Sequence, residues 1–273
     1  MKKTLGIIGF GNMGSAIAER LKDKFSVVVF EKDQDKTASL SGIAIAKDIN
    51  DLFQKAYTII LAVKPQDFDE VLAKIKGNEK GKFIVSIAAG IPTAYIEKQL
   101  SGVRVIRVMP NLPAKIGQGM ICLCRGRFAI DGDLQEVENL FKNLGNTLIL
   151  DENLMDAATA VSGSGPGFLF NGIKGINDKN IPEYASNFAK ELSQAAIFIG
   201  FDQSQANILA DATVKGSIKF LEATKINAEE ARNLVTSKGG TTEAGLKVLN
   251  SGGTLKEAVQ AALTRAKELS KGS

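Results

Sequence analysis

Short, continuous apolar runs rich in β-branched residues alternate with helical patterns through about the first 150 residues of the chain. The runs read "TLGIIGF", "SVVVFE", "TIILAVK", "KFIVSIAA", "VRVIRVM", "GMICLCR" and "NTLILD". Strands that are apolar on both faces are typical of a parallel sheet covered by helices on each side. From about Asp151 onward only long helical patterns remain. The pattern predicts an α/β domain with a doubly wound parallel sheet over residues 1–155 and an all-α domain over residues 156–273.

The first apolar run leads directly into a glycine-rich turn and an amphipathic helix, in "GIIGFGNMGSAIAERL". Gly9, Gly11 and Gly14 form the G-x-G-x-x-G pattern of a Rossmann dinucleotide site. Gly9 permits the tight turn, Gly11 lets a pyrophosphate approach the backbone, and Gly14 allows close helix packing. The same pattern also suits a turn that binds no ligand. The nucleotide interpretation assigns cofactor contacts to the whole stretch Ile8, Gly9, Phe10, Gly11, Asn12, Met13 and Gly14.

Two charged residues, Glu31 and Lys32, end the second predicted strand. An acidic side chain at this position can accept hydrogen bonds from the adenosine ribose hydroxyls, which favours NAD. Lys32 could instead neutralise the 2′-phosphate of NADP, and both residues could equally be solvated turn residues. We expect NADP(H) to be preferred through Lys32, with NAD(H) possible as a second cofactor.

Two other predicted strands end in residues that can contact a ligand, because open α/β sheets bind ligands at the carboxyl ends of their strands. The first ends in "LAVKPQ", where a proline stops the ladder of hydrogen bonds. The second ends in "RVMPNLP". A plain strand ending explains either segment as well. The residues predicted to contact the cofactor here are Ala62, Val63, Lys64, Pro65, Met109 and Asn111.

The net charge of +4 is spread over isolated lysines and arginines, with no basic run. This distribution suits small anionic ligands and argues against nucleic acid as a partner. Cys122 and Cys124 lie two residues apart in a predicted strand and are interpreted as buried apolar residues. No run approaches the roughly 18 apolar residues of a membrane span. We therefore expect a cytoplasmic protein without a bound metal and without a membrane partner.

The chain contains no histidine, so the commonest general acid and base is absent. The predicted helical half instead contains two glycine- and hydroxyl-rich segments, "SGSGP" at 162–166 and "TSKGGTT" at 236–242. Converging backbone amides at a helix start suit a carboxylate. A capped connection between two helices explains "TSKGGTT" equally well.

Seven segments together resemble the pyrroline-5-carboxylate reductases. They are "GFGNMG", "LAVKPQ", "SIAAGI", "RVMPNLP", "AVSGSGP", "VTSKGGTTEAGL" and "VLNSGG", and they occur in this order over essentially the whole chain. The resemblance implies a Rossmann domain, a helical domain that forms homodimers, and in some members a larger ring of dimers. It also implies the last step of proline biosynthesis, in which NADPH or NADH delivers hydride to a cyclic imine.

The resemblance further implies roles for individual residues. Thr242 would hydrogen-bond the ring nitrogen of the substrate, and Asn50 would match a cofactor-binding asparagine. A protonated cyclic imine is already electrophilic, so this chemistry does not need a histidine. The substrate carboxylate would be held by Ser237, Gly239, Gly240 and Thr241.

Lys238 and Phe168 depart from the proline and tyrosine that relatives often have, and the polar segment 171–187 is predicted as a loop or broken helix. One alternative is a β-hydroxyacid-type dehydrogenase, whose catalytic lysine would be Lys215 or Lys219. The other is a non-enzymatic NAD(P)-sensing module. The "TSKGGTT" loop has no place in the dehydrogenase scheme, and the presence of both a complete dinucleotide loop and an anion loop argues against the non-enzymatic module.

Overall fold

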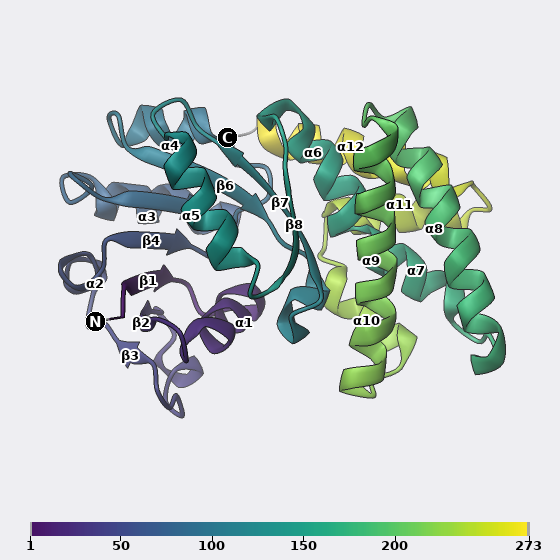
Figure 1. Ribbon diagram of the computed structural model, residues 1–273, viewed down its shortest axis with the longest axis horizontal. Coiled ribbons are helices and arrows are strands. Elements are labelled where there is room, and N and C mark those ends of the chain that lie inside the picture. Colours follow the sequence, from purple (N-terminus) through teal and green to yellow (C-terminus); the bar gives the residue numbers. More distant parts are fainter. Residues whose placement is uncertain (1, 272–273) are drawn as a thin grey trace. The chain divides into compact units, whose positions relative to one another are not determined.

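Eight strands form one sheet in the part of the chain, residues 2–271, that the computed structural model describes (Figure 1). Their order is β3-β2-β1-β4-β5-β6-β7-β8, and the registers from β3 through β6 are parallel. The strands are β1 Thr4–Ile8, β2 Ser26–Phe30, β3 Ala44–Ile45, β4 Thr58–Leu61, β5 Phe83–Ser86, β6 Arg104–Met109, β7 Gly119–Arg125 and β8 Gly145–Ile149. The order reverses between β1 and β4, which creates the switch point of a doubly wound sheet.

All seven predicted apolar runs form strands, and the predicted α/β class is confirmed. The two-residue strand β3 was not predicted. Both of its residues are exposed, and the apolar run around them, residues 43–46, is only four residues long and lies at the edge of the sheet. Cys122 and Cys124 lie on β7 as free, buried cysteines, as expected.

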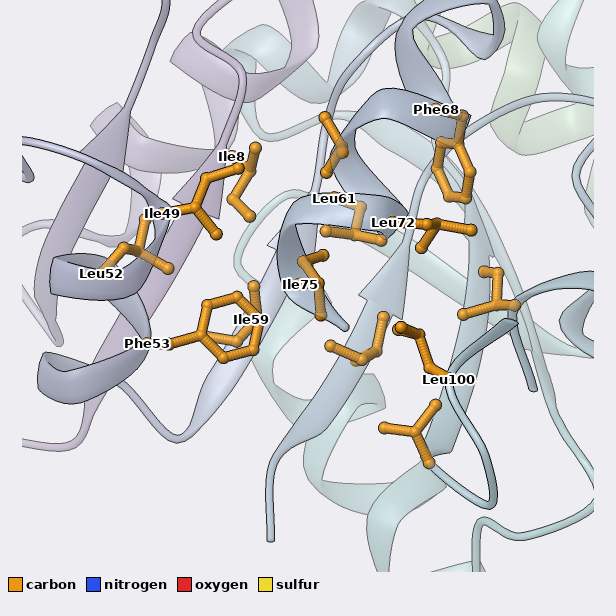
Figure 2. Packing of buried hydrophobic residues seen from close by; sticks show 14 of the residues in the cluster. Ile8, Ile49, Leu52, Phe53, Ile59, Leu61, Phe68, Leu72, Ile75 and Leu100 are labelled. Carbon is orange, nitrogen blue, oxygen red and sulfur yellow. The ribbon is translucent and has the colours of Figure 1, made fainter. Parts of the chain in front are cut away.

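Helices alternate with the strands of the sheet and cover its apolar residues. They are α1 Asn12–Leu21, α2 Ile49–Lys55, α3 Phe68–Ile75, α4 Thr93–Gln99 and α5 Asp131–Phe141. Figure 2 shows Ile59 and Leu61 of β4 packed among Leu52 of α2 and Leu72 and Ile75 of α3. Each of these five side chains is buried. This core fixes the strand ends from which the glycine-rich turn projects.

The remaining helices follow one another without an intervening strand, as predicted (Figure 1, teal to yellow). They are α6 Met155–Ala158, the π-helix η5 Thr159–Gly163, α7 Gly165–Ile173, α8 Ile181–Phe198, α9 Gln203–Thr224, α10 Ala228–Val235, α11 Thr241–Asn250 and α12 Leu255–Lys271. The polar segment 171–187 is a broken helix with a narrow break, because α8 already begins at Ile181. Pro182 is tolerated there because the first turn of a helix does not need its N–H.

The chain divides by contacts into two compact units. The first contains the residues up to Val108 together with Leu123–Asn143, and the second contains Met109–Cys122 together with the residues from Leu144 onward. The second unit thus includes the short helix η3 Leu112–Ile116 as well as the helices. None of the helices among residues 2–271 is both long enough and apolar enough to cross a membrane.

Candidate active site

The three motif glycines are each required for a different reason. Gly9 has a φ of +97°, and a Cβ there would lie 2.7 Å from the Ala62 carbonyl oxygen. A Cβ at Gly14 would overlap the Gly9 carbonyl oxygen. Gly11 precedes α1, is exposed, and has nothing within 4 Å of the position of a Cβ. Gly9 and Gly14 therefore build the turn, whereas the space in front of Gly11 is open to a ligand.

A cavity of about 310 Å³ opens beside this turn in the first unit. It lies where the carboxyl ends of β1, β2 and β4 meet, at the switch point of the sheet. This is the place where open α/β sheets bind nucleotides. Eight of the predicted cofactor residues line it: Ile8, Gly9, Gly11, Glu31, Lys32, Ala62, Val63 and Lys64.

Glu31 is tied to the glycine-rich turn by its own carboxylate. Its Oε2 accepts a hydrogen bond from the Phe10 N–H at 2.6 Å, and its Oε1 accepts from the Asp33 N–H at 3.1 Å. The side chain is only 8% exposed. The carboxylate therefore fixes the turn as well as facing the cavity, a structural role that sequence reasoning did not assign to it.

Lysines and carboxylates surround the outer part of the cavity. Lys32 Nζ lies 2.8 Å from Asp67 Oδ1, and this hydrogen bond raises the pKa of Lys32 and lowers the pKa of Asp67. Lys74 pairs with Glu70 at 2.6 Å, and Lys36 also lines the cavity. Sequence reasoning missed Lys36 and Lys74, because isolated surface lysines give no signal of a site.

Several predicted cofactor residues do not line this cavity. Gly14 and Phe10 support the turn from inside, while Asn12 begins α1 and its carbonyl oxygen accepts from Ser15 Oγ at 3.2 Å. Asn50 lies on α2, where its Oδ1 accepts from Asn78 Nδ2 at 2.8 Å. Its neighbour Ile49 lines the cavity instead. Met13 is half-buried in α1, and Pro65 begins the short helix after β4.

Met109 and Asn111 belong to the second unit. The side-chain amide of Asn111 is buried and fully engaged, since Nδ2 donates to the Ser162 carbonyl oxygen at 3.1 Å and Oδ1 accepts from the Met120 N–H at 2.9 Å. The Met109 methyl packs against Gly163, where a Cβ would approach it to 2.9 Å. Both residues therefore brace the "SGSGP" segment inside this unit.

The "TSKGGTT" loop is held by charged side chains before it leads into α11. Gly239 has a φ of +71°, its N–H donates to Glu243 Oε2 at 2.9 Å, and its carbonyl oxygen accepts from Arg265 Nε at 2.7 Å. The Gly240 N–H donates to the Ser237 carbonyl oxygen at 3.0 Å. The Gly239 N–H is the main reason that the pKa of Glu243 lies below its usual range. Two of the amides predicted to bind the substrate are thus engaged within the loop.

The start of α11 still offers hydrogen-bonding groups to an anion. The first N–H groups of a helix have no partner within the helix, and its N-terminus favours negative charge. Thr241 is half-buried, Ser237 is exposed, and Gly240 at the N-cap supplies no side-chain cap. Lys238 is exposed on the same loop. These groups form a site suited to a carboxylate.

Thr242 lies beneath this site and is 4% exposed. Its hydroxyl donates to Ser164 Oγ at 3.2 Å, and Ser164 Oγ lies 2.9 Å from Thr241 Oγ1. A Cβ at Gly167 would approach the Thr242 methyl to 2.5 Å, so this glycine makes room for the threonine. The "SGSGP" and "TSKGGTT" segments, 77 residues apart in sequence, therefore form one hydroxyl cluster.

The lysines nominated for a hydroxyacid dehydrogenase are exposed on α9 and do not join this cluster. Lys215 Nζ lies 3.6 Å from Asp211 Oδ2, and Lys219 Nζ donates to Gln118 Oε1 at 2.9 Å. Among the described residues, no group of three or more acidic, cysteine or histidine side chains is arranged to hold a metal ion.

A doubly wound sheet with a cavity at its switch point, followed by helices that hold a buried hydroxyl cluster, is the arrangement of an NAD(P)H-dependent oxidoreductase. The chain is 35% identical over 274 residues to the pyrroline-5-carboxylate reductase of Aquifex aeolicus (strain VF5), with 97% of each chain covered. It is 32% identical to that of Synechocystis sp., with 99% of this chain and 100% of the relative covered. The chain belongs to the pyrroline-5-carboxylate reductase family.

Sequence models and solved structures agree with this assignment. The model described as "Pyrroline-5-carboxylate reductase dimerisation" matches residues 180–269, which supports a homodimer, and "NADP oxidoreductase coenzyme F420-dependent" matches residues 4–90. The Plasmodium falciparum pyrroline carboxylate reductase with NADP bound superimposes with a TM-score of 0.62 at 26% identity, covering 98% of each chain. The Coxiella burnetii pyrroline-5-carboxylate reductase gives 0.64 at 28% identity, covering 99% of each chain. The two alternative functions are not favoured.

Proposed function

We propose that this protein reduces the C=N bond of 1-pyrroline-5-carboxylate to give L-proline, the last step of proline biosynthesis. Membership of the pyrroline-5-carboxylate reductase family supports the reaction. The Thr241–Thr242 pair at the start of α11 supports the assignment of the substrate-binding residues. A cyclic imine that bears a carboxylate needs an anion site beside a hydrogen-bonding group for its nitrogen. The hydroxyl cluster supplies both within one helical turn.

The substrate carboxylate is held by Ser237, by the Thr241 hydroxyl and by the free N–H groups of the first turn of α11. In this assignment Gly239 and Gly240 contribute loop geometry, because their own N–H groups are engaged within the loop. The Thr242 hydroxyl contacts the ring nitrogen. Its pKa is too high for an ordinary general acid, so its contribution is orientation and local electrostatics.

The cavity at the glycine-rich turn fits a dinucleotide, because Gly11 leaves open space beside the N-terminus of α1. NADP(H) bound there supplies the hydride. Lys32, Lys36 and Lys74 line the same cavity and favour the 2′-phosphate of NADPH, while the Glu31 carboxylate is engaged by backbone N–H groups. NADH serves as the second cofactor.

The assembly and location also belong to this proposal. Homodimers formed through the helical domain join into a larger ring of dimers, and the protein works in the cytoplasm. The functional boundary between the cofactor domain and the helical domain lies near residue 155. Light scattering of the purified protein measures the assembly, and a mass equal to a single dimer would remove the ring from the proposal.

The test is a spectrophotometric assay of NADPH and NADH oxidation with 1-pyrroline-5-carboxylate, alongside a short 2-hydroxy acid in the reverse direction. Activity with the hydroxy acid alone would overturn the proposed reaction. Thr242→Ala is expected to lower kcat about ten- to a thousandfold, since one positioned polar group is lost, while Thr242→Ser recovers much of the loss.

The competing explanation for Thr242 is a role in stability alone. Alanine would then cost about 1 kcal/mol of folding free energy with normal turnover per folded molecule. Measuring kcat and Tm on the same Thr242→Ala preparation separates the two explanations. A normal kcat with a lowered Tm would contradict the catalytic role.

A further inference from the structure

The hydroxyl of Ser164 lies between the two threonine hydroxyls at the start of α11. Ser164 is 0% exposed, and its Oγ accepts from Thr242 Oγ1 at 3.2 Å and lies 2.9 Å from Thr241 Oγ1. The proposed function uses the two threonines and gives this buried serine no part. Its contacts nevertheless connect the group assigned to the substrate nitrogen with a group assigned to the substrate carboxylate.

The contacts indicate in which direction these hydroxyls can donate. Each hydroxyl carries one proton and two acceptor positions. Thr242 donates its proton to Ser164, so the Thr242 oxygen keeps free lone pairs. In the contact at 2.9 Å between Ser164 Oγ and Thr241 Oγ1, either oxygen can be the donor. Because Ser164 accepts from Thr242, its own proton is available for Thr241 Oγ1, which leaves the Thr241 proton for a ligand. With this direction the chain of three hydroxyls presents an acceptor at Thr242 and a donor at Thr241.

We propose that Ser164 is a positioning residue that sets this polarity for the substrate. This inference rests on the proposed function. In protonated 1-pyrroline-5-carboxylate an N–H donor and a carboxylate acceptor are attached to adjacent ring atoms. The Thr242 oxygen accepts from the N–H, and the Thr241 hydroxyl donates to the carboxylate. A chain of hydrogen bonds strengthens each of its members, so both contacts gain from the connection through Ser164.

The polarity also fits the balance of the reaction. Hydride adds to the imine carbon, the π-electron pair of the C=N bond moves onto nitrogen, and the nitrogen keeps the hydrogen it already carries. No proton has to leave Thr242. An acceptor oxygen beside the N–H stabilises the cationic iminium and holds its ring in one orientation. A proton donor at that position would instead repel the N–H.

The backbone that carries Ser164 is built to place its side chain. The π-helix η5 ends here, and the Ser164 N–H donates to the Thr159 carbonyl oxygen at 2.9 Å, five residues back. π-turns of this kind are frequently found at functional sites. The carbonyl oxygen of Ser162 is held by the buried amide of Asn111. Gly167, in the first turn of α7, leaves the space that the Thr242 methyl fills.

The test compares Ser164→Ala with Ser162→Ala, a matched control two residues away. Ser162 is equally buried, but its hydroxyl donates to the Ala158 carbonyl oxygen and contacts neither threonine. We expect Ser164→Ala to lower kcat about ten- to a hundredfold and to raise the KM for the imine. NADPH affinity should be unchanged, and Ser162→Ala should keep kcat within about twofold.

A double-mutant cycle tests the connection itself. If Ser164 acts through Thr242, Ser164→Ala combined with Thr242→Ala should be little slower than Thr242→Ala alone. Fully multiplicative losses would overturn the inference, and so would a Ser164→Ala enzyme as active as the control. Should the alanine variant fail to fold, Ser164→Cys keeps the volume with a weak donor and should show the same kcat loss. The wild-type enzyme distinguishes a failure of the Ser164 inference from a failure of the proposed function. If the wild type does not reduce the imine, both are overturned; if it does and the variants behave differently from expectation, only the Ser164 inference is overturned.

Discussion

The contrast between Gly11 and Gly14 gives the sharpest test of the cofactor site. Both are motif glycines on the same turn, but a Cβ at Gly11 meets nothing within 4 Å, whereas a Cβ at Gly14 would overlap the Gly9 carbonyl oxygen and lie 3.2 Å from the Ala62 Cβ. A side chain added at Gly11 therefore fills space that is open to a ligand. A side chain added at Gly14 fills space that the protein itself occupies.

We expect Gly11→Val to leave the fold intact. The residue has φ −76° and ψ −165°, an extended conformation that valine adopts without strain. Losing glycine at the N-cap and restricting the unfolded chain act in opposite directions, so stability should change by less than about 1 kcal/mol. The isopropyl group occupies the place of the pyrophosphate. Losing two charge-assisted hydrogen bonds at about 1.5–3 kcal/mol each raises the Kd for NADPH at least about a hundredfold.

Gly14→Ala should show the opposite pattern. A backbone oxygen cannot move aside as a flexible side chain can, so overpacking is expected to cost about 1–3 kcal/mol. The better helix propensity of alanine returns at most about 1 kcal/mol. A net loss of about 1–2 kcal/mol lowers Tm by roughly 2–8 °C.

Thermal unfolding of the ligand-free variants and fluorescence titration with NADPH measure both effects. Wild-type NADPH affinity in folded Gly11→Val would show that the space in front of Gly11 does not belong to the cofactor. A wild-type melting temperature for Gly14→Ala would show that the turn has room that the structure does not show.

Two further predictions concern charge and burial. Lys32→Ala should weaken NADPH binding much more than NADH binding while changing stability little, because its pair with Asp67 is exposed. Equal losses of affinity would show that Glu31 sets the cofactor choice. Burial raises the pKa of the Cys122 thiol to about 12. A thiol reagent should therefore leave Cys122 unmodified in the native protein at neutral pH and react with it once the chain is unfolded. Rapid modification of Cys122 in the native protein would contradict its burial.

The strands and the glycine-rich turn could be predicted because their signals are local. The first run, "TLGIIGF", contains its own evidence of burial, and Gly9, Gly11 and Gly14 stand at its end at fixed spacing. The two-residue strand β3 lacks such a signal, because its exposed residues gain little from packing and its pairing depends on β2. Local patterns thus predict the elements that bury apolar surface.

The side-chain partners could not be predicted, because they join residues far apart in sequence. Ser164 contacts Thr241 and Thr242 from 77 and 78 residues away, and no spacing rule connects the two segments. Glu31 was predicted as a ribose contact from its position at a strand end, yet its bond to the Phe10 N–H depends on the fold of the turn. Asn50 was assigned by resemblance, and its observed bond to Asn78 joins α2 to the turn after α3.

The glycine-rich turn before α1 and the "TSKGGTT" loop before α11 are stabilised in the same way. In each loop one backbone N–H group is held by a carboxylate from a neighbouring element: Glu31, just after β2, accepts from Phe10, and Glu243, in α11, accepts from Gly239. A carboxylate next to an anion site would repel the ligand. Nearby lysines offset this charge, with Lys36 3.9 Å from Glu31 and Lys247 3.5 Å from Glu243. The carboxylates can therefore fix the loops at little electrostatic cost, and the first N–H groups of the following helix, α1 or α11, stay available to an anion, as the proposed function requires.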